Sequence, residues 1–127
     1  PDILICLSPL RRLDVSSYFG HPDHLASGDA ALSAVFPSSR DRLTYPELLE
    51  EGLEPHKVSE VWIMGHDDDD KFVDVTNYID VAVSALKSHS SQTTGEDVGQ
   101  QLIDWRSRTG EKVGFAYAES FKRFLMD

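Results

Sequence analysis

The sequence predicts an α/β domain in which helices flank a mostly parallel sheet. Short apolar segments typical of strands alternate with amphipathic segments of roughly ten to fifteen residues typical of helices. The 127 residues, of which 40% are apolar, suffice for one compact domain with a modest core. We therefore expect a single domain with its site at the carboxyl ends of the strands, where open α/β sheets bind ligands.

The first half of the chain contains two predicted strands and two predicted helices. Residues 1–7 form a short apolar run typical of a buried strand. A helix is expected from Pro22 to Pro37, because proline is favoured at the first helical position and ends a helix that reaches it later. A shorter helix is predicted over 40–51, and a strand over 58–64.

The second half continues the alternation. A polar loop over 65–70 leads to a predicted strand at 71–75, where apolar and polar residues alternate. A helix over 76–88 is expected to be capped by its first residue, Thr76. Apolar residues at helical spacing predict a further helix over 97–110 and, from a weaker pattern, one over 117–126.

Composition limits the kinds of molecule that the protein is expected to bind and the compartment in which it is expected to lie. The formal net charge of −10 argues against nucleic acid, which requires a basic surface. Cys6, the single cysteine, excludes an internal disulfide and fits a reducing cytoplasm. No segment of the sequence has the length and apolarity of a membrane span, and no signal-peptide pattern is visible. Because the chain opens with Pro1 and enters a strand at once, we expect it to be a piece of a longer protein.

Two histidines at the start of the first predicted helix are the candidates for chemistry. His21 and His24 lie three residues apart, so their rings can converge on one side of the first helical turn. One imidazole could hold a metal ion while the other faces a substrate, with Asp23 orienting a ring. Two histidines fall short of the roughly three protein ligands of a catalytic zinc site. From spacing alone, the favoured interpretation is that His21 is a helix cap and His24 a surface residue.

The histidine motif is the first of several short sequence blocks that are separated along the chain. They are Gly20-His21-Pro22-Asp23-His24, Phe36-Pro37, Arg40-Asp41-Arg42-Leu43, Pro46-Glu47-Leu48-Leu49, Gly52-Leu53-Glu54-Pro55-His56-Lys57-Val58, Glu60-Val61-Trp62, Val73-Asp74-Val75-Thr76 and His89-Ser90-Ser91-Gln92. In this order the blocks resemble the C-terminal half of the LmbE/PIG-L family of de-N-acetylases. The resemblance covers nearly the whole chain.

The resemblance implies a Rossmann-like sheet with flanking helices, the C-terminal portion of the LmbE-like fold. It also implies hydrolysis of the acetyl amide of an N-acetylglucosaminyl conjugate with a divalent metal ion, normally zinc. By resemblance, His24 is a metal ligand and His21 stabilises the oxyanion that forms on the acetyl group. Asp23 is then the orienting catalytic partner, and Tyr18 is the candidate for positioning the substrate.

One departure from the family pattern concerns the other half of its site. The family's Ala-His-Pro-Asp-Asp-Glu motif, which supplies the remaining metal ligands and the general base, does not occur before the first strand of this sequence. We therefore expect residues 1–127 to be the C-terminal portion of a single deacetylase domain that is inactive alone. Its expected partners are a small-molecule sugar conjugate and either its own N-terminal half or further copies of the chain.

Other polar residues receive simpler interpretations. The run from Asp67 to Asp70 is expected to be a solvated loop, because the central glycine and ligand spacing of a calcium loop are missing. His56 is expected in a turn, and His89 follows a helix without an assigned role. The competing hypothesis for the whole chain is a fragment or interaction module without bound metal or catalytic activity.

Overall fold

The computed structural model describes residues 1–13, 19–66, 68–93 and 97–127. The chain divides into two compact units. Unit 1 comprises Pro1–Asp69 together with Phe121–Asp127, and unit 2 comprises Asp70–Ser120. Within the described residues, none of the helices combines the length and the apolar character needed to cross a membrane.

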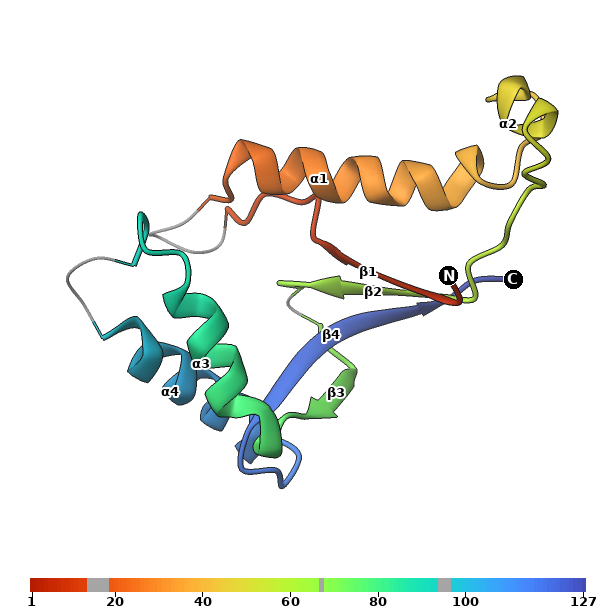
Figure 1. Ribbon diagram of the computed structural model, residues 1–127. Coiled ribbons are helices and arrows are strands. Elements are labelled where there is room, and N and C mark those ends of the chain that lie inside the picture. The colour runs from red at the N-terminus through yellow and green to blue at the C-terminus, as the bar shows by residue number, and fades with distance from the viewer. Residues whose placement is uncertain (14–18, 67, 94–96) are drawn as a thin grey trace. The chain divides into compact units, whose positions relative to one another are not determined.

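Unit 1 is built on a mixed sheet. Strand β1 (Ile3–Leu7) runs parallel to β2 (Glu60–Met64), in a register that pairs Ile3 with Glu60 and Leu7 with Met64. The C-terminal part of β4 (Ala118–Leu125) lies antiparallel on the other side of β2. The predicted α/β class with flanking helices is confirmed, and the parallel pair is the part of the sheet that carries the candidate site (Figure 1).

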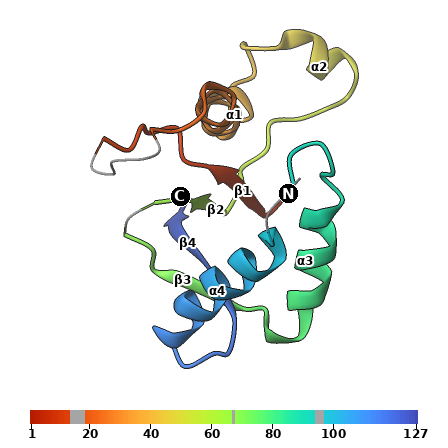
Figure 2. The same ribbon diagram turned by 90° about the vertical axis from the view of Figure 1, so that its left-hand side faces the viewer.

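Helix α1 (Pro22–Ser33) packs on one face of this sheet (Figure 2). Cys6 of β1 and Val61 and Ile63 of β2 point towards it. Together with Val35, after the helix, and Val58, before β2, they form the core cluster of unit 1. The contact is close at Gly28, where an added Cβ would lie 2.4 Å from the carbonyl oxygen of Leu7. Only glycine lets the helix approach the strand backbone this closely.

The segment between α1 and β2 is less helical than predicted. After α1 the chain kinks at Ala34–Ser38, where Phe36 has extended backbone angles, and helix α2 spans only Pro46–Glu50. The predicted start at residue 40 is wrong because the carboxylate of Asp41 bonds the hydroxyl of Thr44 and the backbone N–H of Leu43, closing a turn. These two hydrogen bonds hold the pKa of the Asp41 carboxylate below its usual value, and the bond from Thr44 has the larger effect.

Unit 2 contains β3 (Lys71–Asp74), a short 3₁₀ turn (Thr76–Tyr78), α3 (Ile79–Lys87) and α4 (Val98–Glu111), with β3 beside the N-terminal part of β4. Helix α4 begins as predicted, with the side chain of Asp97 accepting the N–H of Gln100. The predicted cap on α3 is wrong: the hydroxyl of Thr76 accepts the N–H of Tyr117 instead. The strand at 71–75 and the helices near 76–88 and 97–110 are confirmed within a few residues.

The helix predicted over 117–126 is wrong, since this segment forms β4. Its aromatic residues are spaced as on a helix face, but its backbone pairs with β2 from Ile63 and Lys122 to Glu60 and Leu125. Pairing with a distant strand satisfies the backbone groups and overrides the weak local pattern.

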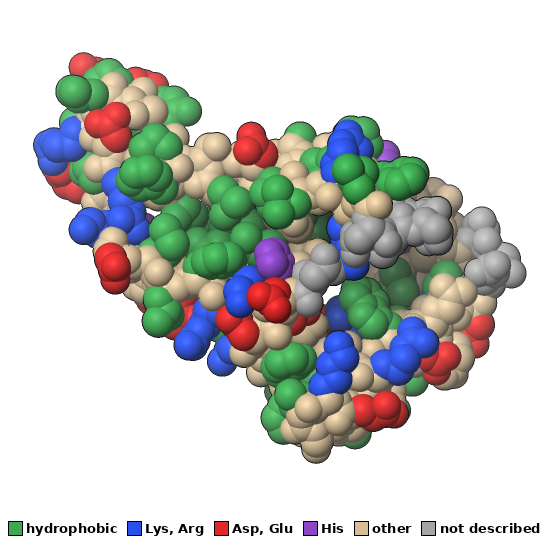
Figure 3. Space-filling view, turned by 180° about the vertical axis from the view of Figure 1, so that it is seen from behind, with side chains coloured by type: hydrophobic (Ala, Val, Ile, Leu, Met, Phe, Trp, Pro, Cys, Tyr) green, Lys and Arg blue, Asp and Glu red, His purple; other side chains and the backbone are tan. Residues whose placement is uncertain are grey.

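Part of the apolar surface of unit 1 remains exposed. On the face of the sheet opposite α1, the side chains of Ile3 and Ile5 are 43% and 51% exposed. On the α1 side, a shallow hollow is bordered by apolar residues that include Leu32, Phe36 and Phe124. Figure 3 shows hydrophobic side chains reaching the surface between polar ones on the face seen from behind.

Candidate active site at the start of helix α1

His21 caps helix α1. Its backbone is extended (φ −70°, ψ 137°), its Nδ1 accepts the backbone N–H of Asp23 at 3.2 Å, and its carbonyl accepts the N–H of Leu25. Pro22 occupies the first helical position, where a missing N–H costs nothing. The helix therefore begins where the sequence predicted, and the interpretation of His21 as a cap is confirmed.

The cap also determines where the neutral His21 ring carries its proton. Since Nδ1 accepts a hydrogen bond, the proton of the neutral ring resides on Nε2, which becomes a donor. The nearer carboxylate oxygen of Asp23 lies 3.8 Å from Nδ1, and this side chain is 87% exposed. The backbone N–H of Asp23 thus orients the His21 ring, and the hydrogen-bond donor of the ring is Nε2.

His24 lies one turn further along α1. Its ring centroid is 5.7 Å from that of His21, and the two ring planes are inclined by 53°. Both residues are exposed. The structure therefore brings the two predicted imidazoles together on the first turn of the helix and leaves them accessible to a ligand.

A small pocket lies beside His24. Its volume is about 220 Å³, and the residues around it are mostly apolar or small: Leu7, Ser8, Leu10, Arg12, Gly20, His24, Leu25, Met64 and Gly65. Leu7 and Met64 end the parallel strands β1 and β2, and the N–H of Ser8 donates to the carbonyl of Met64. The pocket therefore opens at the carboxyl ends of the parallel pair, where α/β sheets bind their ligands.

Arg12 is the residue that sequence reasoning missed. It is half-buried and, among the described residues, is the one formally charged side chain that borders this pocket. The sequence signal was the pair Arg11-Arg12 in the loop before the histidine motif. Arg11 also supports that loop, since its guanidinium donates to the carbonyl of Gly20 at 3.4 Å.

The other predicted polar residues lie elsewhere or outside the described part of the chain. Tyr18 falls among residues 14–18, outside the described residues. His56 lies in irregular backbone, its Nε2 2.7 Å from the carbonyl oxygen of Pro1. His66 accepts the N–H of Asp68 through Nδ1 at 3.1 Å, and the Asp68 carboxylate lies 3.9 Å from the ammonium of Lys122.

Metal ligands are incomplete within the described part of the chain. Nowhere among these residues do three or more His, Cys, Asp or Glu side chains gather as a metal site requires. His24 can offer a ring nitrogen beside the pocket, and His21 already uses Nδ1 in its cap. The described residues around His24 therefore fall short of the roughly three protein ligands of a catalytic zinc site.

Comparisons with known proteins identify relatives of this chain in sequence and in fold. No protein-family model matches the chain. A diacetylchitobiose deacetylase from Thermococcus kodakarensis is 31% identical over 110 residues, which cover 83% of this chain and 40% of that protein. The structure of N,N′-diacetylchitobiose deacetylase from Pyrococcus horikoshii is 25% identical, with a TM-score of 0.80, covering 98% of this chain and 46% of that one.

The conserved protein TT1542 from Thermus thermophilus is similar in fold, with a TM-score of 0.69 at 22% identity, covering 96% of this chain and 51% of that one. The chain thus spans about half the length of the relatives that it matches. The resemblance to the LmbE/PIG-L de-N-acetylases is confirmed: the chain is homologous to one segment of diacetylchitobiose deacetylase and shares its fold.

Proposed function

We propose that this chain forms part of the active site of a metal-dependent hydrolase that removes the acetyl group from an N-acetylglucosaminyl substrate. The observation that carries the proposal is the pair of imidazoles on the first turn of α1, with His24 bordering a pocket at the ends of β1 and β2. Homology to diacetylchitobiose deacetylases supports the substrate class.

His24 is proposed as the ligand that this chain contributes to a zinc or other divalent ion. Ligation uses a ring nitrogen of a neutral imidazole, and His24 holds its ring at the rim of the pocket. When bound, the ion would polarise the substrate carbonyl and make water a better nucleophile. The remaining ligands and the general base are proposed to come from the other half of the protein.

His21 is proposed to donate a hydrogen bond to the oxygen of the acetyl group as negative charge develops there. The cap supports this role, because it holds the ring at Nδ1 and directs the proton of the neutral ring to Nε2. A donor fixed before the reaction needs no reorganisation during it. The orienting role that the resemblance implies for Asp23 is therefore proposed for its backbone N–H, which holds the ring, while its exposed carboxylate lies 3.8 Å from Nδ1.

Substrate contacts are proposed on the same side of unit 1. Arg12 borders the pocket next to His24 and can donate to sugar hydroxyls or to the substituent on the sugar. Tyr18 keeps the positioning role that the family resemblance implies. The pocket volume of about 220 Å³ suits a small group such as the acetamide rather than a whole conjugate.

The proposed protein partner is the N-terminal half of the same domain or further copies of the chain. Among the described residues, β1 pairs on one side only, with β2, so its other edge is available to another strand. The exposed side chains of Ile3 and Ile5 lie on this strand. A reducing cytoplasm is proposed as the location, in keeping with the buried thiol of Cys6, whose pKa is raised by burial.

The decisive experiment measures acetate release from N,N′-diacetylchitobiose by the full-length protein and by residues 1–127 alone. We expect zinc-dependent turnover by the full-length protein and none by residues 1–127. Turnover by the short chain with zinc would show that it holds every ligand, and no turnover by the metal-loaded full-length protein would exclude the proposed reaction.

The competing function is an interaction module without a bound metal ion. It is favoured by the lack of a three-ligand group among the described residues. Elemental analysis separates the two hypotheses, because the enzyme requires about one equivalent of metal per full-length protein and the module requires none.

A further inference from the structure

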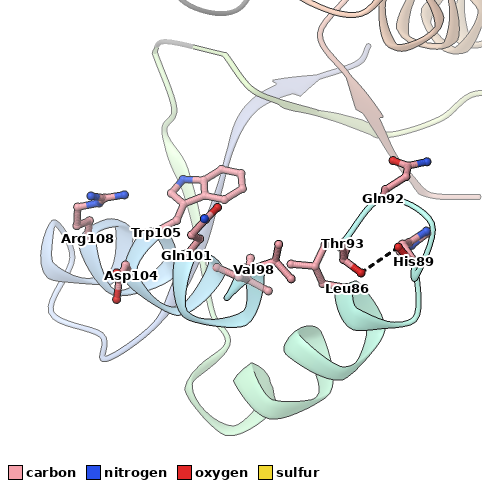
Figure 4. A pocket seen from close by; sticks show the side chains of 10 residues that line it. Leu86, His89, Gln92, Thr93, Val98, Gln101, Asp104, Trp105 and Arg108 are labelled. Carbon is pink, nitrogen blue, oxygen red and sulfur yellow. Dashed lines mark hydrogen bonds between the residues drawn. The ribbon is translucent and has the colours of Figure 1, made fainter. Parts of the chain in front are cut away.

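Unit 2 contains a larger hollow that the proposed reaction does not use. Its volume is about 830 Å³, within the range of about 300–1,000 Å³ usual for small-molecule sites. One wall is a face of α4 on which Val98, Gln101, Trp105 and Arg108 follow one another at helical spacing. Leu86 and residues after the end of α3 form another wall (Figure 4).

Trp105 presents a fixed aromatic surface to this hollow. The side chain is 55% exposed, although large aromatic side chains are usually mostly buried. The guanidinium of Arg106 lies 4.4 Å from the ring centroid and is ion-paired with Glu119 at 2.7 Å. With Arg106 mostly buried behind it, the indole is supported on one face and remains open on the other.

The polar groups around Trp105 suit a neutral ligand rich in hydroxyl groups. Gln92 and Gln101 supply amides that can both donate and accept. The hydroxyl of Thr93 donates to the carbonyl of His89, which leaves its oxygen as an acceptor for a ligand. The two formal charges in the lining, on Asp104 and Arg108, have opposite signs, so the lining favours neither an anion nor a cation.

We propose that this hollow binds a saccharide, with one pyranose ring stacked on the open face of Trp105. A pyranose combines an apolar face of C–H groups with a rim of hydroxyls, which matches a flat aromatic ring surrounded by amides and charged hydrogen-bonding groups. The choice of N-acetylglucosamine oligomers as the saccharide rests on the proposed function. The preference for a neutral sugar follows from the lining of the hollow alone.

The test uses the full-length protein with the substitution His24→Ala, so that the ligand is not consumed. Tryptophan emission and calorimetry are followed during titration with N,N′-diacetylchitobiose and with longer N-acetylglucosamine oligomers. We expect saturable binding that becomes about tenfold weaker or worse in Trp105→Ala and is largely kept in Trp105→Phe, which retains a flat ring.

The matched control is Trp62→Phe, which alters the second tryptophan of residues 1–127, packed against Phe121 in unit 1. This change should leave the affinity for the oligomers unaltered. Equal affinity in the parent and in a folded Trp105→Ala variant, or no binding of any oligomer, would overturn the saccharide site. Deacetylation is measured separately, in the full-length protein that retains His24. Turnover there, combined with oligomer affinity that does not depend on Trp105, would overturn this site alone. Trp105-dependent binding combined with no turnover by the protein that retains His24 would overturn the proposed reaction alone.

Discussion

Two histidines of this chain make the same local hydrogen bond in different surroundings. His21 and His66 each accept, through Nδ1, the backbone N–H of the residue two positions later, at 3.2 and 3.1 Å. After His21 the chain continues as a helix of 12 residues, whereas residues 68–70, beyond His66, are irregular backbone that leads into β3. The bond is therefore present both with and without a helix behind it, and does not by itself make a site.

The continuation of the chain makes the difference. Pro22 at the first helical position starts α1, and the next turn of that helix brings His24 beside the ring of His21 and against a pocket. Acidic residues follow His66, and the carboxylate of Asp68 lies near the ammonium of Lys122. A second imidazole on a rigid element therefore distinguishes the candidate site from an ordinary turn.

The largest effect is expected from His24→Ala in the full-length protein. If His24 is a metal ligand, its removal should reduce deacetylation to background, a loss beyond the roughly 10²–10³-fold cost of removing one oxyanion donor. Acetate release and metal content, measured on the same preparation, check this. If the variant keeps its metal and its turnover, His24 is not part of the site and does not differ in function from His66.

Substitution of His21 separates its cap from its chemistry. Both His21→Ala and His21→Asn should lower kcat by about 10²–10³-fold, since neither offers an Nε2 donor. His21→Ala should also lose about 1 kcal/mol of stability, which His21→Asn retains because asparagine is a good cap. Steady-state kinetics and thermal unfolding of the two variants together check this. Recovery of activity by asparagine would mean that His21 matters only as a cap.

The position of α1 can be disturbed through Gly28. In Gly28→Ala the new methyl group would meet the Leu7 carbonyl oxygen at 2.4 Å, so helix and strand must separate, at a cost of about 1–3 kcal/mol. Chemical denaturation and the labelling rate of the buried thiol of Cys6 report on this contact, and both should indicate a looser unit 1. Ser27→Ala, on the exposed side of the same helix, is the control. Equal stability of the two variants would show that the close approach at Gly28 is not required.

The parts of this site that the sequence predicted are those that depend on neighbours along the chain. Pro22 is favoured at the first helical position and indicates where α1 begins, and the spacing of three residues places His24 beside His21. The strands β1 and β2 were recognisable because each is a short apolar run. The position of the pocket was predictable because open α/β sheets bind their ligands at the carboxyl ends of parallel strands.

The parts that were missed depend on groups far apart in the sequence. β4 was predicted as a helix because its partner, β2, is distant and its aromatic spacing suits either structure. Arg12 was given no role because its place beside His24 is decided by the path of a loop. The hollow around Trp105 requires both the end of α3 and one face of α4, which no local pattern brings together.

The smallest effect is expected from His66→Ala, which tests the other side of the comparison. Its side chain bonds one backbone N–H, that of the exposed residue Asp68, and no helix follows, so stability should change by no more than about 0.5 kcal/mol. Metal content and turnover should stay at the parent level, measured beside His24→Ala. A loss of metal in His66→Ala would make the acidic loop a source of ligands, and the two histidine turns would then share a function as well as a hydrogen bond.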